Sequence, residues 1–211
     1  GDNGASVSAS AQSAPAELAT STGVPGATQT ALRQELLTQM AEFDVPGAAV
    51  EVCVPGKEPF VLTEGVSDLG TQAPMTPDLV WPLRSVTKSF TVTLLLQLVD
   101  EGKVSLDDTI GKWVPGVPNG DQITLRQLAN MTSGVPEYTT KAWIDDFLAD
   151  ENRNFTTAEL IAYALAEPAQ FPPGSQAVYV NTSTLLIGQA VASVAGAEFP
   201  DVLQQRILTP L

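Results

Sequence analysis

Hydrophobic and polar residues repeat along this chain with two different periods, and these periods predict one pair of strands among several helices. Large apolar residues recur at helical spacing from Leu32 to Phe43, which predicts a helix there. Residues 48–54 alternate as a strand does, and after a turn at 55–58 the stretch 59–64 can return antiparallel to them. The pattern therefore begins with one helix and one strand pair.

The most apolar stretch predicts a helix buried inside a domain. Between Val86 and Glu101 apolar side chains cover most of the circumference of a helix, and Gly102 can end it. Ser85 then stands as the cap or the first residue of this helix. Further helices are predicted at 125–130, 157–166, 182–195 and 199–208, the first three beginning beside Thr124, Thr156 and Thr182.

The fold class that follows is a helix-rich α/β mixture of the α+β kind. A helix and a strand pair occupy residues 31–65, and a helical region follows from about 85 to 211. Two strands cannot cover so many helices well, so the sheet is expected to be incomplete within this chain.

Residues 1–30 differ from the rest in composition. They are rich in Ala, Ser, Thr, Gly and Pro and contain few large apolar residues, which predicts a flexible, solvated segment with structure beginning near Ala31. They contain no initiator Met, no basic stretch and no apolar leader. We infer an exported protein whose leader has been removed, with a cloned fragment as the alternative.

Composition narrows the function by exclusion. The 211 residues carry 24 acidic and 10 basic side chains, a net charge of −14, and no histidine. The acidic balance argues against nucleic acid as a partner, because binding the phosphate backbone needs clustered Lys and Arg. Without histidine the chain can assemble neither a Ser-His-Asp triad nor a histidine-ligated zinc site. Any catalytic base must therefore be another residue type.

Two further features are predicted to be unremarkable in chemistry. No stretch approaches the roughly 20 apolar residues that a membrane-spanning helix needs. The single cysteine, Cys53, lies in the alternating stretch 50–54, which favours a small buried hydrophobic residue over a reactive thiol.

The first candidate for chemistry is the tetrad Ser85-Val86-Thr87-Lys88 at the start of the apolar helix. Positions i and i+3 share a helix face, so the lysine amine can reach the serine hydroxyl. The helix N-terminus offers free N–H groups to an anion that develops on a substrate carbonyl. A lysine withdrawn from water also loses its proton more readily and can act as a base. The alternative interpretation is an ordinary cap serine beside a solvated lysine.

The second candidate is Tyr179-Val180-Asn181, which precedes the predicted helix at 182–195. Residues two apart on an extended segment point the same way, so the Tyr179 hydroxyl and the Asn181 amide can face one pocket. By itself the pattern also fits a structural tyrosine whose hydroxyl is satisfied elsewhere.

Together the two motifs resemble the penicillin-recognising serine hydrolases. These are D-alanyl-D-alanine carboxypeptidases, class C β-lactamases and related esterases, which share the β-lactamase/transpeptidase-like fold of a helical subdomain and an antiparallel sheet. The resemblance runs from about Ala31 to Leu211. The segments that are similar in order and spacing include 45–50, 74–77, 83–88, 95–103, 123–128, 132–134, 173–174 and 179–182.

The resemblance implies a role for each candidate residue. Ser85 would be the acylated nucleophile and its N–H half of an oxyanion hole, while Lys88 would take its proton. Tyr179 would carry that proton to the leaving group, and Asn181 would bind a substrate amide. The implied substrates are D-alanyl-D-alanine peptides or β-lactams, with neither cofactor nor metal. The implied location is the cell envelope, the periplasm or outside the cell.

One departure from the family pattern matters. Family members carry a third motif, Lys or His followed by Thr or Ser and Gly, on a strand of the main sheet, and nothing after Tyr179 matches it. We therefore expect a second polypeptide to supply the remaining strands, and activity only with that partner. Two other functions stay open: an esterase on the same scaffold, and a non-catalytic penicillin-binding-like envelope protein.

Overall fold

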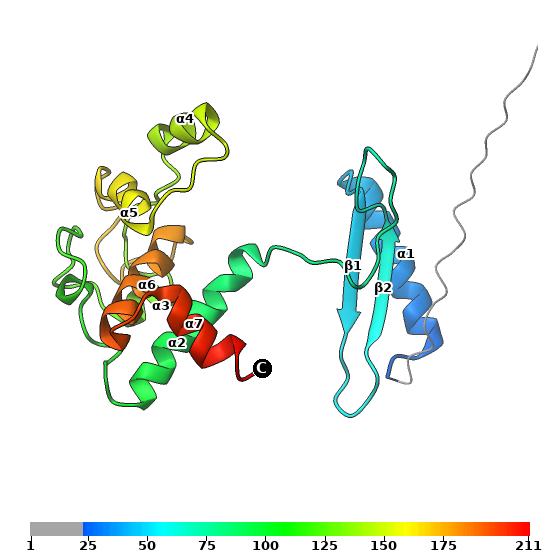
Figure 1. The fold of residues 1–211 in the computed structure, drawn as a ribbon, viewed down its shortest axis with the longest axis horizontal. Helices are drawn as coiled ribbons and strands as arrows, with labels where there is room; N and C mark the ends of the chain where they lie inside the picture. The colour runs from blue at the N-terminus through cyan, green and yellow to red at the C-terminus, as the bar shows by residue number, and fades with distance from the viewer. Residues whose placement is uncertain (1–22) are drawn as a thin grey trace, which may run out of the picture. The chain divides into compact units, whose positions relative to one another are not determined.

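The computed structural model describes residues 23–211, and the chain divides into two compact units, residues 1–82 and 83–211. The described part of the first unit contains one helix and both strands, and the second contains the remaining helices (Figure 1). Most of the predicted flexible segment, residues 1–22, lies outside the described residues.

The first unit is a helix packed on a two-stranded ribbon. Helix α1 (Gly26–Glu42) precedes strands β1 (Gly47–Val52) and β2 (Phe60–Gly65). The strands are antiparallel, with Gly47 opposite Gly65, as the alternating pattern predicts. Among the described residues this ribbon is the sole sheet.

The core of the first unit is small, and it explains why α1 begins earlier than predicted. Val24 is buried with Phe60 and Leu62 of β2. The Gln29 amide donates to the Val24 carbonyl at 2.9 Å, which fixes the first turn of the helix. The prediction that structure begins near Ala31 is therefore wrong. Burial of Val24 stabilises structure there, although the residues that follow it are mostly small or polar.

Cys53 also contradicts its prediction. It is exposed, whereas the alternation in 50–54 predicted a buried residue. Strand β1 ends at Val52, so the strand period no longer fixes the direction of the next side chain. The Cys53 thiol donates to a Glu51 carboxylate oxygen at 3.5 Å, and this contact raises the pKa of the thiol, which disfavours the reactive thiolate.

The second unit is built on two long helices, α2 (Thr87–Asp100) and α6 (Asn181–Ala195), which pack against each other. Shorter helices surround them: α3 (Leu125–Ala129), α4 (Lys141–Ala149), α5 (Thr157–Leu165) and α7 (Phe199–Leu203). The remaining turns are the 3₁₀ turns η1 (Arg84–Val86) and η2 (Ile110–Lys112) and the π turn η3 (Gln204–Leu208).

Apolar side chains of α2 and α6 form the centre of this unit. Leu94 and Leu98 of α2 are fully buried, as are Leu186 and Ile187 of α6. The prediction of a buried helix over 86–101 is confirmed, with helical residues from Thr87 to Asp100. Burying apolar area in this way is the main favourable term in folding, at about 25 cal/mol per Å².

The predicted caps are correct at two helices and wrong at the third. Thr124 and Thr156 each begin a helix with a capping box, completed by Gln127 and Glu159. Thr182 is fully buried inside α6, which begins one residue earlier and lacks a side-chain cap. The predicted helix 199–208 is α7 followed by the π turn.

Helix α4 was not among the helices that the sequence predicted. Thr140 caps it by accepting the Trp143 N–H at 3.2 Å. The Trp143 ring stacks on Phe147 at 5.3 Å and meets Tyr138 edge-on at 5.5 Å between centroids. Aromatic contacts thus hold a helix whose other face is acidic.

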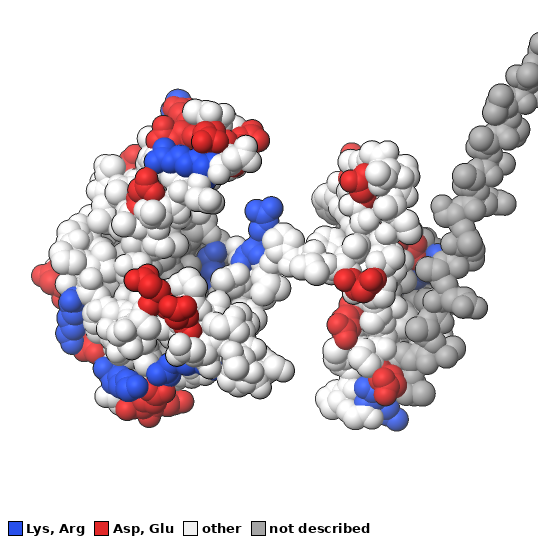
Figure 2. Space-filling model, viewed as in Figure 1, with Lys and Arg blue, Asp and Glu red and all other residues white. Residues whose placement is uncertain are grey.

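On the face shown in Figure 2, charge is spread rather than gathered in one patch. Acidic side chains are scattered across the face shown in Figure 2, with basic ones often next to them. Within residues 23–211, no helix is both long and apolar enough to cross a membrane.

Candidate active site

The N-terminal end of α2 presents the first pair of predicted site residues. Ser85 is exposed in the turn η1, where the Val86 N–H donates to the Leu83 carbonyl at 3.0 Å. Lys88 is half-buried in the first turn of α2, and its Nζ donates to Ser85 Oγ at 3.1 Å. The i, i+3 spacing therefore brings the two side chains into contact as predicted.

The second pair lies where an extended segment enters α6. Val180 has extended backbone angles and is buried, so its two neighbours, Tyr179 and Asn181, share the opposite side. The Tyr179 hydroxyl donates to Ser85 Oγ at 2.9 Å. Lys88 Nζ donates to Asn181 Oδ1 at 2.7 Å. All four predicted site residues therefore form one hydrogen-bonded cluster, in which Asn181 joins through Lys88, although more than 90 residues separate the two pairs.

The electrostatics of this cluster act on the tyrosine. Lys88 Nζ lies 4.9 Å from the centre of the Tyr179 ring. The interaction with Lys88, then the hydrogen bond with Ser85, lowers the pKa of Tyr179 below its usual value. The negative charge of Glu137 opposes this shift. A nearby cation thus makes the phenolate more accessible than in an isolated tyrosine.

Backbone hydrogen bonds hold the segment that carries Tyr179. The Val178 N–H donates to the Met131 carbonyl at 3.0 Å, and the Gly174 N–H donates to the Thr132 carbonyl at 2.8 Å. The loop after α3 therefore lies alongside this segment and sets its position.

Gly134 makes a close backbone approach to Phe171, just before the segment that carries Tyr179. Its φ of +75° is in the left-handed region, and a Cβ built there would lie 2.1 Å from the Phe171 carbonyl oxygen. The Gly134 carbonyl in turn accepts the Gln170 N–H at 2.9 Å. Only glycine fits this backbone conformation and this contact.

The sequence reasoning missed one residue of the site, Glu137. Its Oε2 accepts the Asn181 N–H at 2.5 Å, and its Oε1 accepts the Tyr138 N–H at 2.8 Å. A carboxylate at a helix N-terminus also interacts favourably with the helix dipole. Glu137 thus holds the first residue of α6, whose side chain binds Lys88. An acid 44 residues before the helix it serves leaves no local pattern in the sequence.

A cavity opens beside the cluster, with a volume of about 1090 Å³. Ser85, Lys88 and Asn181 line one part of it, and Gly188 and Phe199 line another. A volume of this order accommodates a ligand of substrate size beside the serine. No group of three or more potential metal ligands occurs among the described residues.

Comparison with known proteins places the chain in a family. The sequence model of the Beta-lactamase family matches residues 32–211. "Penicillin-binding protein 4" of Amycolatopsis lactamdurans is 33% identical over 176 residues, which cover 81% of this chain and 44% of that protein. "Beta-lactamase" of Escherichia coli K12 is 30% identical over 171 residues, covering 79% of this chain and 42% of that protein.

Solved structures give the same result. The D-amino acid amidase from Ochrobactrum anthropi SV3, complexed with L-phenylalanine, superposes with a TM-score of 0.75 at 30% identity, covering 86% of this chain and 49% of that one. The D-stereospecific amidohydrolase from Streptomyces sp. gives a TM-score of 0.75 at 32% identity, with coverage of 85% and 54%. The chain thus spans about half the length of these relatives. It belongs to the Beta-lactamase family, which confirms the predicted resemblance and fold.

Proposed function

We propose that this Beta-lactamase-family chain provides the nucleophile of a serine hydrolase that works through an acyl-enzyme. One observation carries the proposal: Ser85 Oγ accepts hydrogen bonds from both Lys88 and Tyr179 at 3.1 and 2.9 Å. A serine hydroxyl is a weak nucleophile unless a base lies within hydrogen-bond reach. In a chain without histidine, these two groups are placed to act as that base.

The acylation step uses these contacts directly. Lys88 Nζ takes the Ser85 proton while Oγ bonds to the substrate carbonyl carbon and the carbonyl electron pair moves to oxygen. The Ser85 N–H, at the start of the helix, stabilises that oxyanion. Tyr179 then delivers its hydroxyl proton to the leaving group as the old bond to carbon breaks, and it regains a proton from Lys88, which holds the one taken from Ser85. Water releases the acyl group by the reverse sequence.

For the substrate we propose an amide or lactam next to a D-configured residue, such as a D-alanyl-D-alanine peptide or a β-lactam. The names of the relatives support this class: a penicillin-binding protein, a β-lactamase, a D-amino acid amidase and a D-stereospecific amidohydrolase. Asn181 is placed to bind the substrate amide, because it lines the cavity beside Ser85 and Lys88.

We further propose that the working site contains a second polypeptide segment with the remaining strands, and that the protein acts outside the cytoplasm. A two-stranded sheet among the described residues and coverage of 42–54% of the relatives' lengths support the added segment. Several apolar residues of the second unit are exposed, including Leu83 and Val86 beside the nucleophile, and such a segment has apolar surface to cover.

Intact mass spectrometry before and after incubation with a penicillin tests the proposal and counts the polypeptides present. We expect a mass increase equal to the penicillin on the protein, and none on a Ser85→Ala variant. Ser89→Ala, one turn along the same helix, is the matched control and keeps the adduct. An adduct that persists on Ser85→Ala contradicts the proposed nucleophile. Absence of both adduct and hydrolysis from the protein with its second segment contradicts the function.

A further inference from the structure

Arg84, the residue immediately before the nucleophile, is the exception among the arginines of this chain. The other four each lie within 3.0 Å of a carboxylate: Arg33 with Glu64, Arg126 with Asp107, Arg153 with Glu159, and Arg206 with Glu101. Within residues 23–211, Arg84 makes neither an ion pair nor a side-chain hydrogen bond. Although the chain carries 24 acidic side chains, none of those within residues 23–211 pairs with this basic group.

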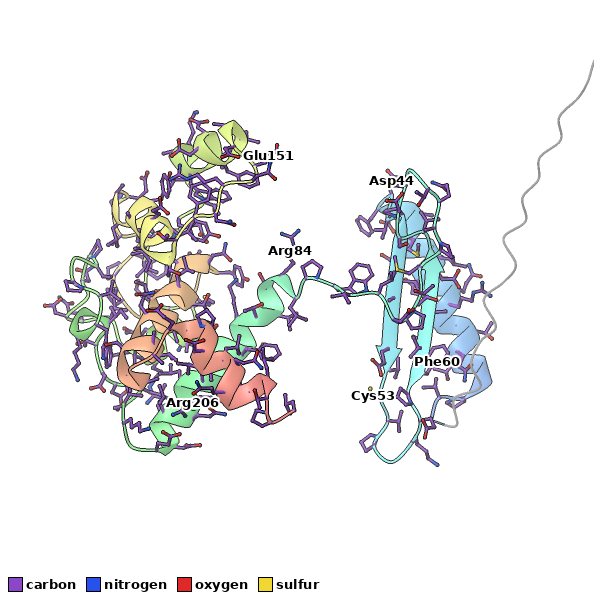
Figure 3. All side chains as sticks on the ribbon, in the orientation of Figure 1. Asp44, Cys53, Phe60, Arg84, Glu151 and Arg206 are labelled. Atoms are coloured by element: carbon purple, nitrogen blue, oxygen red, sulfur yellow. The ribbon has the colours of Figure 1, made fainter. Side chains whose placement is uncertain are left out.

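The position of Arg84 puts this unpaired charge beside the nucleophile. Arg84 lines the same cavity as Ser85 and Lys88, and its side chain projects from the start of α2 (Figure 3). Three charged residues line the cavity: Arg84, Lys88 and Glu198. Lys88 is already engaged with Ser85 and Asn181. The guanidinium of Arg84 is therefore the cation of the cavity that is available to a ligand.

The backbone conformation of Arg84 also supports a functional role for this residue. Its φ of +49° lies in the left-handed region, which costs energy for any residue with a Cβ. Glycine adopts this conformation freely, so backbone geometry alone gives no reason for an arginine here. Such strained conformations cluster at functional sites.

We propose that Arg84 is a specificity-determining residue that binds a carboxylate on the substrate being acylated onto Ser85. The guanidinium presents paired N–H donors that match a carboxylate, and a charge-assisted pair of this kind is stronger than a neutral hydrogen bond. Because the chain as a whole carries −14, an anionic substrate needs a local positive group to approach the serine. The inference rests on the proposed function and narrows it to anionic substrates over simple neutral esters.

Matched chromogenic esters test this inference on the protein with its second segment. N-succinyl-D-alanine and N-acetyl-D-alanine 4-nitrophenyl esters differ by one carboxylate on the acyl side. The 3-carboxyphenyl and phenyl esters of N-acetyl-D-alanine differ by one on the leaving group. The readout is the ratio of kcat/KM for the anionic ester to that for the neutral one, in both pairs.

We expect a ratio well above one in at least one pair, and a fall of about 10- to 100-fold in Arg84→Gln. Arg84→Lys keeps the charge and loses the paired geometry, so its ratio falls less. Arg84→Gly fits the left-handed backbone, so it keeps the test valid if the glutamine variant unfolds. Its ratio should fall as far as that of Arg84→Gln. Added salt lowers the ratio of the unmodified protein.

Arg126→Gln removes the same charge elsewhere and is the control for net charge. A ratio that is unchanged in Arg84→Gln and Arg84→Gly overturns the inference, and so does an equal fall in Arg126→Gln. If the protein hydrolyses both esters in a Ser85-dependent way with ratios near one, the hydrolase proposal stands and the Arg84 proposal fails. If it acylates with no ester and no penicillin, both fail.

Discussion

The middle and the N-terminal end of the α2–α6 pair contrast sharply in chemistry. In the middle, Leu94 and Ile187 are fully buried and their neighbours are mostly apolar. At the end, Ser85 and Tyr179 are exposed, and polar atoms meet across the two helices. The buried middle fixes the distance between helices, and the end uses that distance to bring together groups far apart in sequence. Stability and chemistry should therefore respond separately to substitution.

We expect the largest difference between the effect on acylation and the effect on stability at Lys88. Lys88→Met removes the amine that contacts Ser85 Oγ, and we expect acylation to slow by about 10²- to 10⁴-fold, the range typical of a lost general base. The melting temperature should hold or rise, because active-site polar groups are commonly kept at some cost in stability. Adduct formation timed by mass spectrometry, beside thermal unfolding, measures both effects.

Lys103→Met is the matched control, since Lys103 follows the other end of α2 and contacts Glu101. It should leave the acylation rate unchanged. Rapid acylation by Lys88→Met would show that Tyr179 alone activates the serine.

The converse substitution lies in the middle of the same helix. Leu94→Ala should lower the free energy of unfolding by about 2–5 kcal/mol through lost burial and a residual cavity. The acylation rate per folded molecule should stay near that of the unmodified protein. Leu96→Ala, at a position 44% exposed, should cost much less. Chemical denaturation measures the cost, and equal costs for the two variants would contradict the assignment of the core.

Substitution of Glu137 should have an intermediate effect on acylation, because this residue acts through Asn181. Glu137→Ala leaves the Asn181 N–H without its carboxylate, and we expect acylation to slow by about tenfold. Glu137→Gln keeps an acceptor oxygen and should lose less. Lys88 and Ser85 lower the pKa of Tyr179 while the Glu137 charge opposes them, so both variants should lower that pKa further.

The falling limb of the pH–rate profile reports loss of the Tyr179 proton that the leaving group needs, so it should move to lower pH in both Glu137 variants. Glu151→Gln, an acid in the exposed turn after α4, is the control and should leave the profile in place. A pH–rate profile that does not move in the Glu137 variants would show that Glu137 only caps α6 and has no effect on the pKa of Tyr179.

The smallest effect is spectroscopic and needs no substrate. The Lys88 ammonium favours the Tyr179 phenolate, so it lowers the pKa of that phenol. In Lys88→Met the pKa should rise toward the usual value of about 10, and the phenolate should form at higher pH. Ultraviolet titration of phenolate absorbance, with Tyr179→Phe subtracted, follows this one side chain. A transition at the same pH in both proteins would contradict the pairing.

Much of the secondary structure was predictable because its signals are local. The apolar circumference of α2 and the Thr156 capping box depend on residues within a few positions of each other. Helix α4 was missed because its acidic face obscured the aromatic residues, and these meet partners outside the helix. Cys53 was misplaced because a strand period says nothing about where the strand ends.

The candidate site divides in the same way. The Ser85–Lys88 contact follows from helical spacing, and the shared direction of Tyr179 and Asn181 from strand geometry. That the two pairs meet was indicated by the family resemblance, since no spacing rule links residues so far apart. Glu137 and the free charge of Arg84 emerged only with the folded structure, because each depends on which partners come near.

Gly134 sets a limit on how this protein can evolve. It has no part in the chemistry, yet any side chain there would collide with the Phe171 carbonyl and push aside the segment that carries Tyr179. A survey of all single substitutions should therefore find Gly134 as intolerant as the nucleophile itself. Natural variants can change cavity residues that take no part in the chemistry, but position 134 must keep a hydrogen atom in place of a side chain.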